Sequence, residues 1–276
     1  AAFLPMRLPR LIAAAAAGAA LALAGAVLQR LTANPIASPE VLGVSGGAAL
    51  GYAGTVFAVA APTTVMLGAG SMLGGALALG LVALFTARRD MPAERVLLAG
   101  IAVSAFASAV LAAIMAAGDA RSWQILGWLS GSSSAVGMGA ALGLAGMALA
   151  LWVAALGTRR WLAVLPLGYG VAGGLGLPLR RARLVLIALA GLATGAATIL
   201  VGPLSFVGLI APHLARRMGL ARPGDAVTGA ALIGALLMLA ADFGARMAGF
   251  PYELPLGLFA SLIGAPWLIW LMMRRR

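Results

Sequence analysis

Apolar stretches of about 20 residues recur along the whole chain, and this recurrence restricts the possible fold more than any other feature of the sequence. A helix of that length crosses the hydrocarbon core of a lipid bilayer. Of the 276 residues, 63% are hydrophobic and 9% are charged, so the chain has too few polar residues to cover a water-soluble domain. The sequence predicts an all-α fold, a polytopic transmembrane helical bundle that forms a single membrane domain over residues 1–276.

Proline, glycine and arginine residues separate nine predicted membrane spans. The predicted spans cover residues 8–29, 41–61, 63–86, 95–117, 137–157, 183–201, 204–217, 226–248 and 255–273. The span 204–217 is short. We expect it to cross only part of the membrane and to pack against other helices, because lipid cannot hydrogen-bond an exposed backbone.

The basic residues are all arginines, and the nine spans distribute them unequally between the two sides of the membrane. One side has four, namely Arg7, Arg10, Arg121 and Arg246. The other side has fifteen, namely Arg30, Arg88, Arg89, Arg95, Arg159, Arg160, Arg180, Arg181, Arg183, Arg216, Arg217, Arg222, Arg274, Arg275 and Arg276. Because cytoplasmic loops are enriched in basic residues, this bias places the C-terminus in the cytoplasm and the N-terminus outside. Short arginine clusters between apolar runs are typical of such loops, and we therefore reject nucleic-acid binding as the reason for the net charge of +12.

Residue types that catalyse reactions or bind metal ions are scarce. Cysteine is absent and His213 is the one histidine, which excludes a thiolate or multi-histidine metal site and leaves little from which to build an intramembrane enzyme. We expect His213 to hydrogen-bond to neighbouring backbone. The chain has no lysine and no glycine-rich phosphate loop, so it carries no ATPase of its own.

The few acidic residues lie near the ends of predicted spans or in loops, which argues against a secondary transporter that couples to protons or sodium through buried acids. Asp242 and Arg246 are four residues apart, and this spacing predicts an ion pair on the surface of one helix. Glu40 and Glu253 are expected at helix edges that water can reach, in structural roles.

Three segments are too specific for generic membrane sequence: NPIASPEVLGVSGGA at 34–48, GPLSFVGLIAPH at 202–213, and LPLG at 254–257 with IGAPW at 263–267. Together they resemble the permease family that imports iron siderophores, haem and cobalamin, and the resemblance covers essentially the whole chain. ASPEVLG at 37–43 and WLSGS at 128–132 are most similar to the ferric hydroxamate branch, in particular to the second half of its fused permeases.

The resemblance implies nine spans of a ten-span permease half in a bacterial inner membrane, so an earlier helix or a longer fused polypeptide is expected before residue 1. It also implies a second permease half, two cytoplasmic ATPase subunits that use the ATP, and an external substrate-binding protein. No cofactor is expected to bind this chain directly. The expected cargo is an iron(III)-siderophore of the hydroxamate class, and haem or cobalamin stays open as the alternative.

The resemblance further assigns roles to residues. Arg7, Arg10 and Arg246 are expected to dock the binding protein through its acidic residues, with snorkelling to lipid headgroups as the alternative. The long cytoplasmic loop at 158–182 is expected to fold as short coupling helices against the ATPase, with a flexible linker as the alternative. Its expected coupling residues are Leu165, Leu167, Gly168, Leu175 and Gly176.

An external segment at 119–136 mixes tryptophan with serines between two spans and is expected to re-enter the mouth of the pore. Hydroxyl groups and aromatic edges suit a bulky chelate that must pass without tight binding. The predicted lining residues are Trp128, Ser130, Ser132 and Ser133. By family position, the cytoplasmic gate is expected near Met91 to Arg95, at Ala93 and Glu94.

Overall fold

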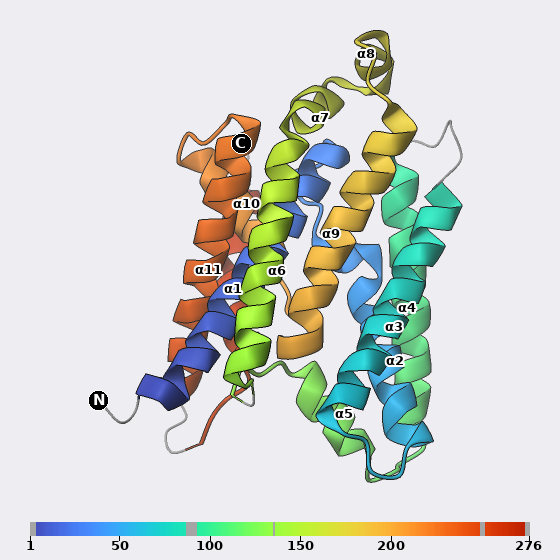
Figure 1. The fold of residues 1–276 in the computed structure, drawn as a ribbon, viewed down its shortest axis with the longest axis vertical. Helices are drawn as coiled ribbons and strands as arrows, with labels where there is room; N and C mark the ends of the chain where they lie inside the picture. Colours follow the sequence, from blue (N-terminus) through green and yellow to red (C-terminus); the bar gives the residue numbers. More distant parts are fainter. Residues whose placement is uncertain (1–3, 87–92, 135, 249–251, 274–276) are drawn as a thin grey trace.

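The computed structural model describes residues 4–86, 93–134, 136–248 and 252–273. Every regular element within these residues is a helix, which confirms the predicted all-α fold. The long helices run side by side along the long axis of the molecule (Figure 1). One end of the bundle carries the N-terminus and α5 (Ser122–Leu129), and the opposite end carries α7 (Arg159–Val164) and α8 (Tyr169–Gly174).

Each of the nine predicted spans contains one helix. These helices are α1 (Leu4–Leu31), α2 (Val44–Ala58), α3 (Thr64–Thr86), α4 (Ala93–Ala116), α6 (Met138–Gly157), α9 (Leu179–Val201), α10 (Val207–Arg217), α11 (Pro223–Met247) and α12 (Leu256–Met273). Two 3-10 helices, η1 (Pro39–Leu42) and η2 (Leu165–Leu167), complete the regular structure of the described residues.

Six of these helices are long and apolar enough to cross a membrane: α1, α3, α4, α6, α9 and α11. The other three are shorter than a full span. α2 has 15 residues and α10 has 11, so at a rise of about 1.5 Å per residue neither crosses a hydrocarbon core of about 30 Å. Both follow an irregular connection, at 32–38 and at 202–206, where proline and positive-φ residues end regular helix.

Helix α1 lies at the centre of the bundle, where it packs against α6, α9, α10 and α11 (Figure 1). Alanine dominates its sequence, and the small side chains let neighbouring backbones come close. Gly18 of α1 and Gly234 of α11 face each other so closely that a Cβ on either one would collide with the other's carbonyl. Packing at such points replaces the hydrophobic driving force that lipid removes.

Helices α2 and α3 make a second close contact through glycines. Gly47 and Gly51 of α2 lie against Gly70 and Gly74 of α3, each pair four residues apart on its helix. A Cβ on Gly51 would collide with the carbonyl of Gly70. This spacing of small residues is the usual means by which membrane helices pack at short range.

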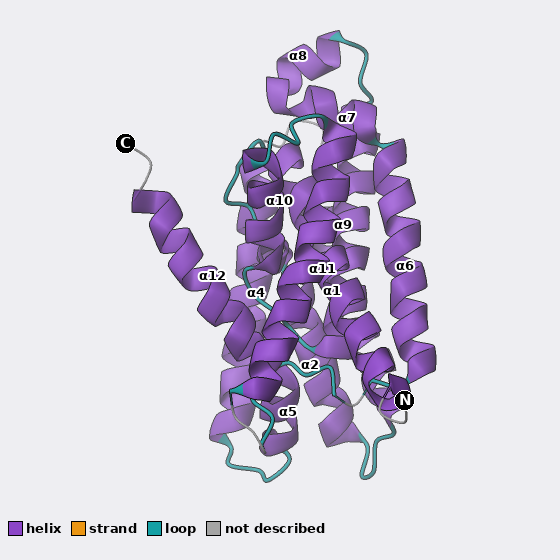
Figure 2. Ribbon diagram, turned by 90° about the vertical axis from the view of Figure 1, so that its left-hand side faces the viewer, coloured by secondary structure: helices purple, strands orange, loops and turns teal. Residues whose placement is uncertain are grey.

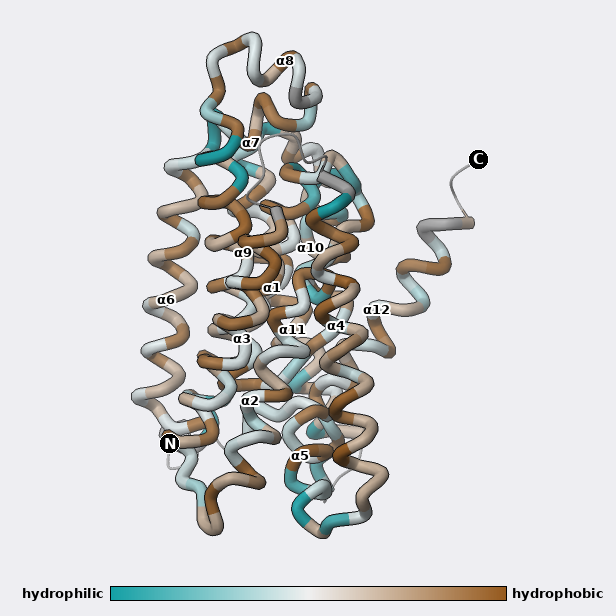
Figure 3. Tube along the Cα trace, turned by 90° about the vertical axis from the view of Figure 1, so that its right-hand side faces the viewer, coloured by the Kyte–Doolittle hydropathy of each residue, from teal (hydrophilic) through white to brown (hydrophobic). Residues whose placement is uncertain are grey.

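The hydropathy of the surface agrees with a membrane location. Hydrophobic residues run along the long helices, and hydrophilic residues gather near the α5 end and near the end with α7 and α10 (Figure 3). Large apolar side chains on α3, α4 and α6 are exposed, among them Leu84, Phe106 and Leu149. Helix α12 tilts away from the bundle, so its C-terminal part lies apart from the other helices (Figure 2). It lies on the side of the molecule opposite α6.

Candidate functional site

Four charged side chains and one serine meet at the α5 end of the bundle. Arg10 of α1 donates from Nε to Asp242 Oδ1 of α11 at 2.7 Å and from Nη1 to Glu253 Oε1 at 2.6 Å. Arg246 Nε lies 3.2 Å from Asp242 Oδ2. The hydroxyl of Ser133 donates to Asp242 Oδ1 at 2.7 Å. We refer to these five residues as the charge cluster.

Most of the charge cluster is shielded from water, so each buried charge must be stabilised by the other members of the cluster. The side chain of Asp242 is fully buried, and those of Arg10 and Arg246 are 12% and 20% exposed. A buried carboxylate stays ionised only where cations and hydrogen-bond donors replace water. Two arginines and two acids make the cluster formally neutral, so it joins α1, α11 and two connecting segments without leaving an unpaired buried charge.

The predicted ion pair between Asp242 and Arg246 is confirmed, but its predicted place on the helix surface is wrong. Arg10 and Ser133 approach Asp242 from other parts of the chain and close off its face of α11. They lie 232 and 109 residues away in sequence, so no local spacing could have indicated these contacts.

The three arginines predicted to dock a binding protein all lie at this end, but they differ in exposure. Arg7 is exposed on the first turns of α1. Arg10 and Arg246 are engaged by acids of their own chain. A docking protein could reach Arg7 without disturbing the charge cluster, whereas Arg10 would first have to exchange Asp242 or Glu253 for an acid of the partner.

The segment at 119–136, predicted to be external, contains α5 followed by irregular chain over its described residues. Trp128, one of the predicted lining residues, stacks on Tyr52 of α2 with ring centroids 4.6 Å apart. Beyond α5, the amide of Ser132 donates to the carbonyl of Val201 at 3.0 Å, at the end of α9. The segment therefore turns back from α5 toward the interior of the bundle.

The predicted lining serines divide into two groups. Ser130 and Ser132 are partly or fully exposed. Ser130 donates its hydroxyl to a carbonyl of α5, and the hydroxyl of Ser132 lies 2.8 Å from that of Ser134, which was not among the predicted lining residues. Ser133 is fully buried and bonded to Asp242. The structure thus brings Ser133 into the charge cluster, a contact that its sequence neighbours did not indicate.

The predicted coupling residues lie at the opposite end, in α7, η2 and α8. Leu165 is buried, whereas Leu167 and Leu175 are 61% and 65% exposed. Gly168 and Gly176 have φ angles of 98° and 77°, which favour glycine. The segment contains the short helices α7, η2 and α8, and it presents apolar side chains at the end of the bundle. Its role in coupling stays a prediction.

The predicted gate falls at the start of α4. Ala93 is the first residue of this helix and Glu94 is the second, but the side chains of both lie outside the described residues, as does Met91. The position and chemistry of the gate stay predictions.

Two arginines near the α7 end are held by neutral groups. Arg30 donates to the carbonyls of Leu162 at 3.3 Å and Ala221 at 2.8 Å, and Arg216 donates to Gln29 Oε1 at 2.7 Å. The guanidinium groups of Arg30 and Arg216 are close enough to repel each other. Sequence reasoning placed these arginines on this side of the molecule but missed their acceptors.

The single histidine lies near this pair, on α10. Arg217 donates from Nε to His213 Nε2 at 3.3 Å, so one observed partner is a side chain one helical turn away. The predicted bond of His213 to backbone stays a prediction. Among the described residues, no three His, Cys, Asp or Glu side chains lie close enough to hold a metal ion.

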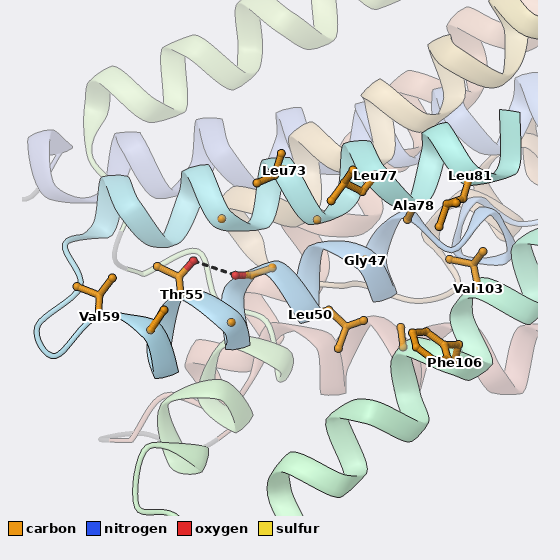
Figure 4. Close-up of a pocket in the computed structure, with 16 residues that line it drawn as sticks. Gly47, Leu50, Thr55, Val59, Leu73, Leu77, Ala78, Leu81, Val103 and Phe106 are labelled. Atoms are coloured by element: carbon orange, nitrogen blue, oxygen red, sulfur yellow. Dashed lines mark hydrogen bonds between the residues drawn. The ribbon is translucent and has the colours of Figure 1, made fainter. Parts of the chain in front are cut away.

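A pocket of about 450 Å³ opens between α2, α3 and α4 (Figure 4). Glycines and apolar side chains such as Leu73 and Phe106 line it. Thr55 is the one polar side chain among the described lining residues, and its hydroxyl already donates to the carbonyl of Gly51 at 2.9 Å. The pocket therefore suits apolar groups and offers no polar group that could hold an ion or begin a reaction.

Comparison with known proteins places this architecture in a transport family. The model of the FecCD transport family matches residues 1–274. The iron(3+)-hydroxamate import system permease protein FhuB of Salmonella typhimurium is 43% identical over 272 residues, which are 99% of this chain and 40% of that protein. The vitamin B12 import system permease protein BtuC of Citrobacter koseri is 38% identical over 281 residues, which cover 98% of this chain and 82% of BtuC. The chain thus spans about two fifths of the length of FhuB.

A solved metal-chelate type ABC transporter in an inward-facing conformation has the same fold, with a TM-score of 0.90 and 29% sequence identity over 99% of this chain and 88% of that one. PsaBC from Streptococcus pneumoniae shares the fold more distantly, with a TM-score of 0.57 and 16% identity. The match of nearly every residue to the family model and the near-complete alignment with BtuC lead to one conclusion: the chain belongs to the FecCD transport family.

Proposed function

We propose that this chain forms half of the membrane pore of an ATP-driven importer that carries an iron(III)-hydroxamate siderophore into the cytoplasm. The observation that supports this cargo is the 43% identity to FhuB across nearly the whole chain. BtuC, at 38%, supports the same kind of importer with a different cargo, so a haem or cobalamin importer is the second candidate.

The proposal includes the partners that such a pore requires. They are a second permease half, two cytoplasmic ATPase subunits that hydrolyse the ATP, and an external binding protein that delivers the chelate. In this arrangement the chain lies in a bacterial inner membrane with its C-terminus in the cytoplasm, as the arginine distribution indicates. The chain itself catalyses no reaction.

The exposed leucines of η2 and α8 support a protein partner at the α7 end. η2 and α8 lie beyond the long helices (Figure 1). Leu167 in η2 and Leu175 directly after α8 are largely exposed, and apolar side chains gain little from facing water. We propose that these side chains enter a groove of the ATPase subunit and transmit its movement. At the other end, Trp128 and the exposed serines after α5 are proposed to line the entrance for the chelate.

Uptake into proteoliposomes tests the function directly. The chain is reconstituted with its second permease half, ATPase and binding protein, and radioactive iron is supplied as a ferric trihydroxamate. We expect uptake that requires ATP inside the vesicle and the binding protein outside. Uptake of cobalamin in place of the ferric chelate would select the second candidate. Uptake that continues without ATP and stops with an ionophore would overturn the importer.

A second experiment tests the proposed ATPase contact. Leu167→Asp combined with Leu175→Asp places charge on the exposed surface of η2 and α8, and we expect the ATPase subunit to be lost on co-purification. Leu126→Asp in α5 is the matched control, because Leu126 is also exposed but lies at the opposite end. Equal ATPase recovery from both variants would contradict the contact.

A further inference from the structure

The two irregular connections meet inside the bundle. Residues 32–38 lead from α1 into η1, and residues 202–206 lead from α9 into α10. Gln29, at the end of α1, donates to the carbonyl of Ala37 in the first connection and to the carbonyl of Leu209 in the first turn of α10, which holds the first connection beside the start of α10. Backbone groups at this depth must find partners within the protein, because lipid supplies none.

Glu40 of η1 makes the contact that starts α10. Its carboxylate Oε1 accepts a hydrogen bond from the amide of Phe206 at 3.0 Å. Phe206 precedes the first residue of α10, where helices leave amides without partners and where the helix dipole favours a negative charge. No side chain next to α10 in sequence caps it, so the cap comes from Glu40, 166 residues earlier.

Phe206 is held in a conformation that it would not adopt freely. Its φ is 71° and its ψ is −28°, in the left-handed region that side chains other than glycine rarely occupy. The hydrogen bond to Glu40 is therefore a constraint on the backbone at this point. Without an acceptor for its amide, the backbone of Phe206 should relax to a conformation with negative φ, which is lower in energy for a residue with a side chain.

The side chain of Phe206 connects this point to α12. A Cβ added to Gly264, in the middle of α12, would collide with the Cβ and ring of Phe206, so the phenylalanine packs directly on the glycine. α12 is the helix that leans away from the bundle (Figure 2). Any rotation of Phe206 would move the group on which the middle of α12 rests.

The backbone of Glu40 is fixed separately from its carboxylate. Ser104 of α4 donates its hydroxyl to the carbonyl of Glu40 at 3.3 Å. Gly100, one turn earlier on α4, lies so close to the carbonyl of Val41 that a Cβ there would collide with it. Contacts with α4 therefore fix the backbone of Glu40, while its side chain extends to α10.

We propose that Glu40 is a positioning residue that sets the angle of α12 through Phe206. The carboxylate fixes the amide of Phe206, the amide fixes the backbone conformation, and the ring of Phe206 fixes the middle of α12. This role concerns the relation between helices within one chain, and it holds whatever cargo the importer carries.

Electron spin resonance distances can test the proposal, because a chain without cysteine accepts two spin labels at chosen sites alone. Leu149→Cys on α6 and Ile269→Cys on α12 provide exposed sites on opposite sides of the bundle (Figure 2). In the otherwise unchanged chain, purified in detergent, we expect one narrow distance distribution. Glu40→Ala should broaden or shift that distribution by several ångströms.

Two matched variants separate the proposed link from general loosening. Glu40→Gln keeps an oxygen that can accept from Phe206 and should retain the original distances. Ser104→Ala removes a hydrogen bond to the carbonyl of Glu40 and leaves its carboxylate in place, so it should also retain them. Unchanged distances in Glu40→Ala would overturn the proposal, even if its melting temperature falls. Distances in Glu40→Gln or Ser104→Ala that move as far as in Glu40→Ala would overturn it as well.

The second link can be tested in the same way. Phe206→Ala removes the ring that packs on Gly264 and should move α12 as Glu40→Ala does. Combining the two substitutions should add little, because both act on one connection. Fully additive shifts would overturn the link through Phe206. If Glu40→Ala yields no folded protein, Glu40→Asp, whose carboxylate is one methylene short of Phe206, takes its place with the same expectations. The measurement does not use transport, so its outcome is distinct from that of the uptake experiment.

Discussion

The described arginines at the two ends of the bundle bond to different kinds of partner. Four ion pairs between described side chains lie at the α5 end, where Asp242, Glu253 and Asp119 accept from arginines. At the α7 end, Arg30 and Arg216 bond to carbonyl and amide oxygens that carry no net charge. At the first end, Arg10, Arg246 and Arg121 are thus neutralised by acids of the chain, whereas Arg30 and Arg216 at the second end are bonded to neutral groups.

This difference indicates that the α5 end is stabilised by contacts within the chain, whereas the α7 end keeps positive charge that other molecules can bind. A neutral, buried cluster stabilises the contact between α1 and α11 and needs nothing from outside. Half-buried arginines with neutral acceptors keep their full charge for anionic lipid headgroups or acidic protein surfaces. Arg7, at the α5 end, is exposed and lies outside the charge cluster.

Removing Asp242, the central acid of the charge cluster, should lower the stability of the chain more than any other substitution considered. Asp242→Ala leaves Arg10 and Arg246 without their buried partner and Ser133 without its acceptor. Breaking a buried ion pair from one side costs about 3–5 kcal/mol. We expect the melting temperature in detergent to fall by about 10 °C, measured by tryptophan fluorescence and checked by size-exclusion chromatography.

Asp242→Asn is the matched control for that experiment. It keeps an acceptor oxygen for Ser133 and Arg10 while it removes the charge, so its melting temperature should lie between those of Asp242→Ala and the unchanged chain. A melting temperature for Asp242→Ala within a degree or two of the unchanged chain would show that the charge cluster does not stabilise the fold.

The charge cluster also shows how far the sequence could lead. Apolar length predicted every long helix, since twenty-odd apolar residues in lipid have few alternatives to a helix. Helical spacing predicted the pair of Asp242 and Arg246. Arg10 was assigned to docking because the family resemblance placed it outside, and nothing in the sequence showed that α1 passes close to Asp242.

The interruptions of the helices were only partly predictable. Gly202 and Pro203 indicated a break before α10, and α10 begins at residue 207. The left-handed conformation of Phe206 was not foreseen, because it depends on the carboxylate of Glu40 from a distant segment. Glu40 was expected in a structural role at a helix edge in water, and its specific partner follows only from the packing of η1 against α10.

At the α7 end, a single substitution should have a smaller effect than at the charge cluster. Arg216→Ala leaves the Oε1 atom of the buried Gln29 without its donor, which costs about 1–3 kcal/mol, and relief of the repulsion from Arg30 offsets part of this cost. The melting temperature should fall by less than half as much as in Asp242→Ala. Arg159→Ala, an exposed arginine of α7, is the control and should leave it unchanged. A fall as large as that of Asp242→Ala would mean that both ends rely equally on their arginines.

Docking should distinguish Arg7 from Arg10. Arg7→Glu reverses an exposed charge, and we expect the external binding protein to associate several-fold more slowly, most clearly at low salt. Arg7→Lys keeps the charge and should restore the rate. Arg10→Glu should lower the melting temperature as well, because it opposes Asp242 and Glu253. An unchanged association rate in Arg7→Glu would remove Arg7 from the docking surface.

The exposed ion pair at the α5 end should have the smallest effect. Hydrogen bonds from Arg121 lower the pKa of Asp119 from 3.8 to about 2. A lowered pKa stabilises the fold above the unfolded value of 3.8, and this contribution disappears only as the pH falls through about 2. The melting temperatures of the unchanged chain and of Asp119→Ala should therefore change in the same way with pH between about pH 5 and pH 8. The difference between the two should be small and constant, because exposed ion pairs contribute little to stability. An offset that shrinks within that range would show that Asp119 titrates near neutral pH, which would contradict its lowered pKa.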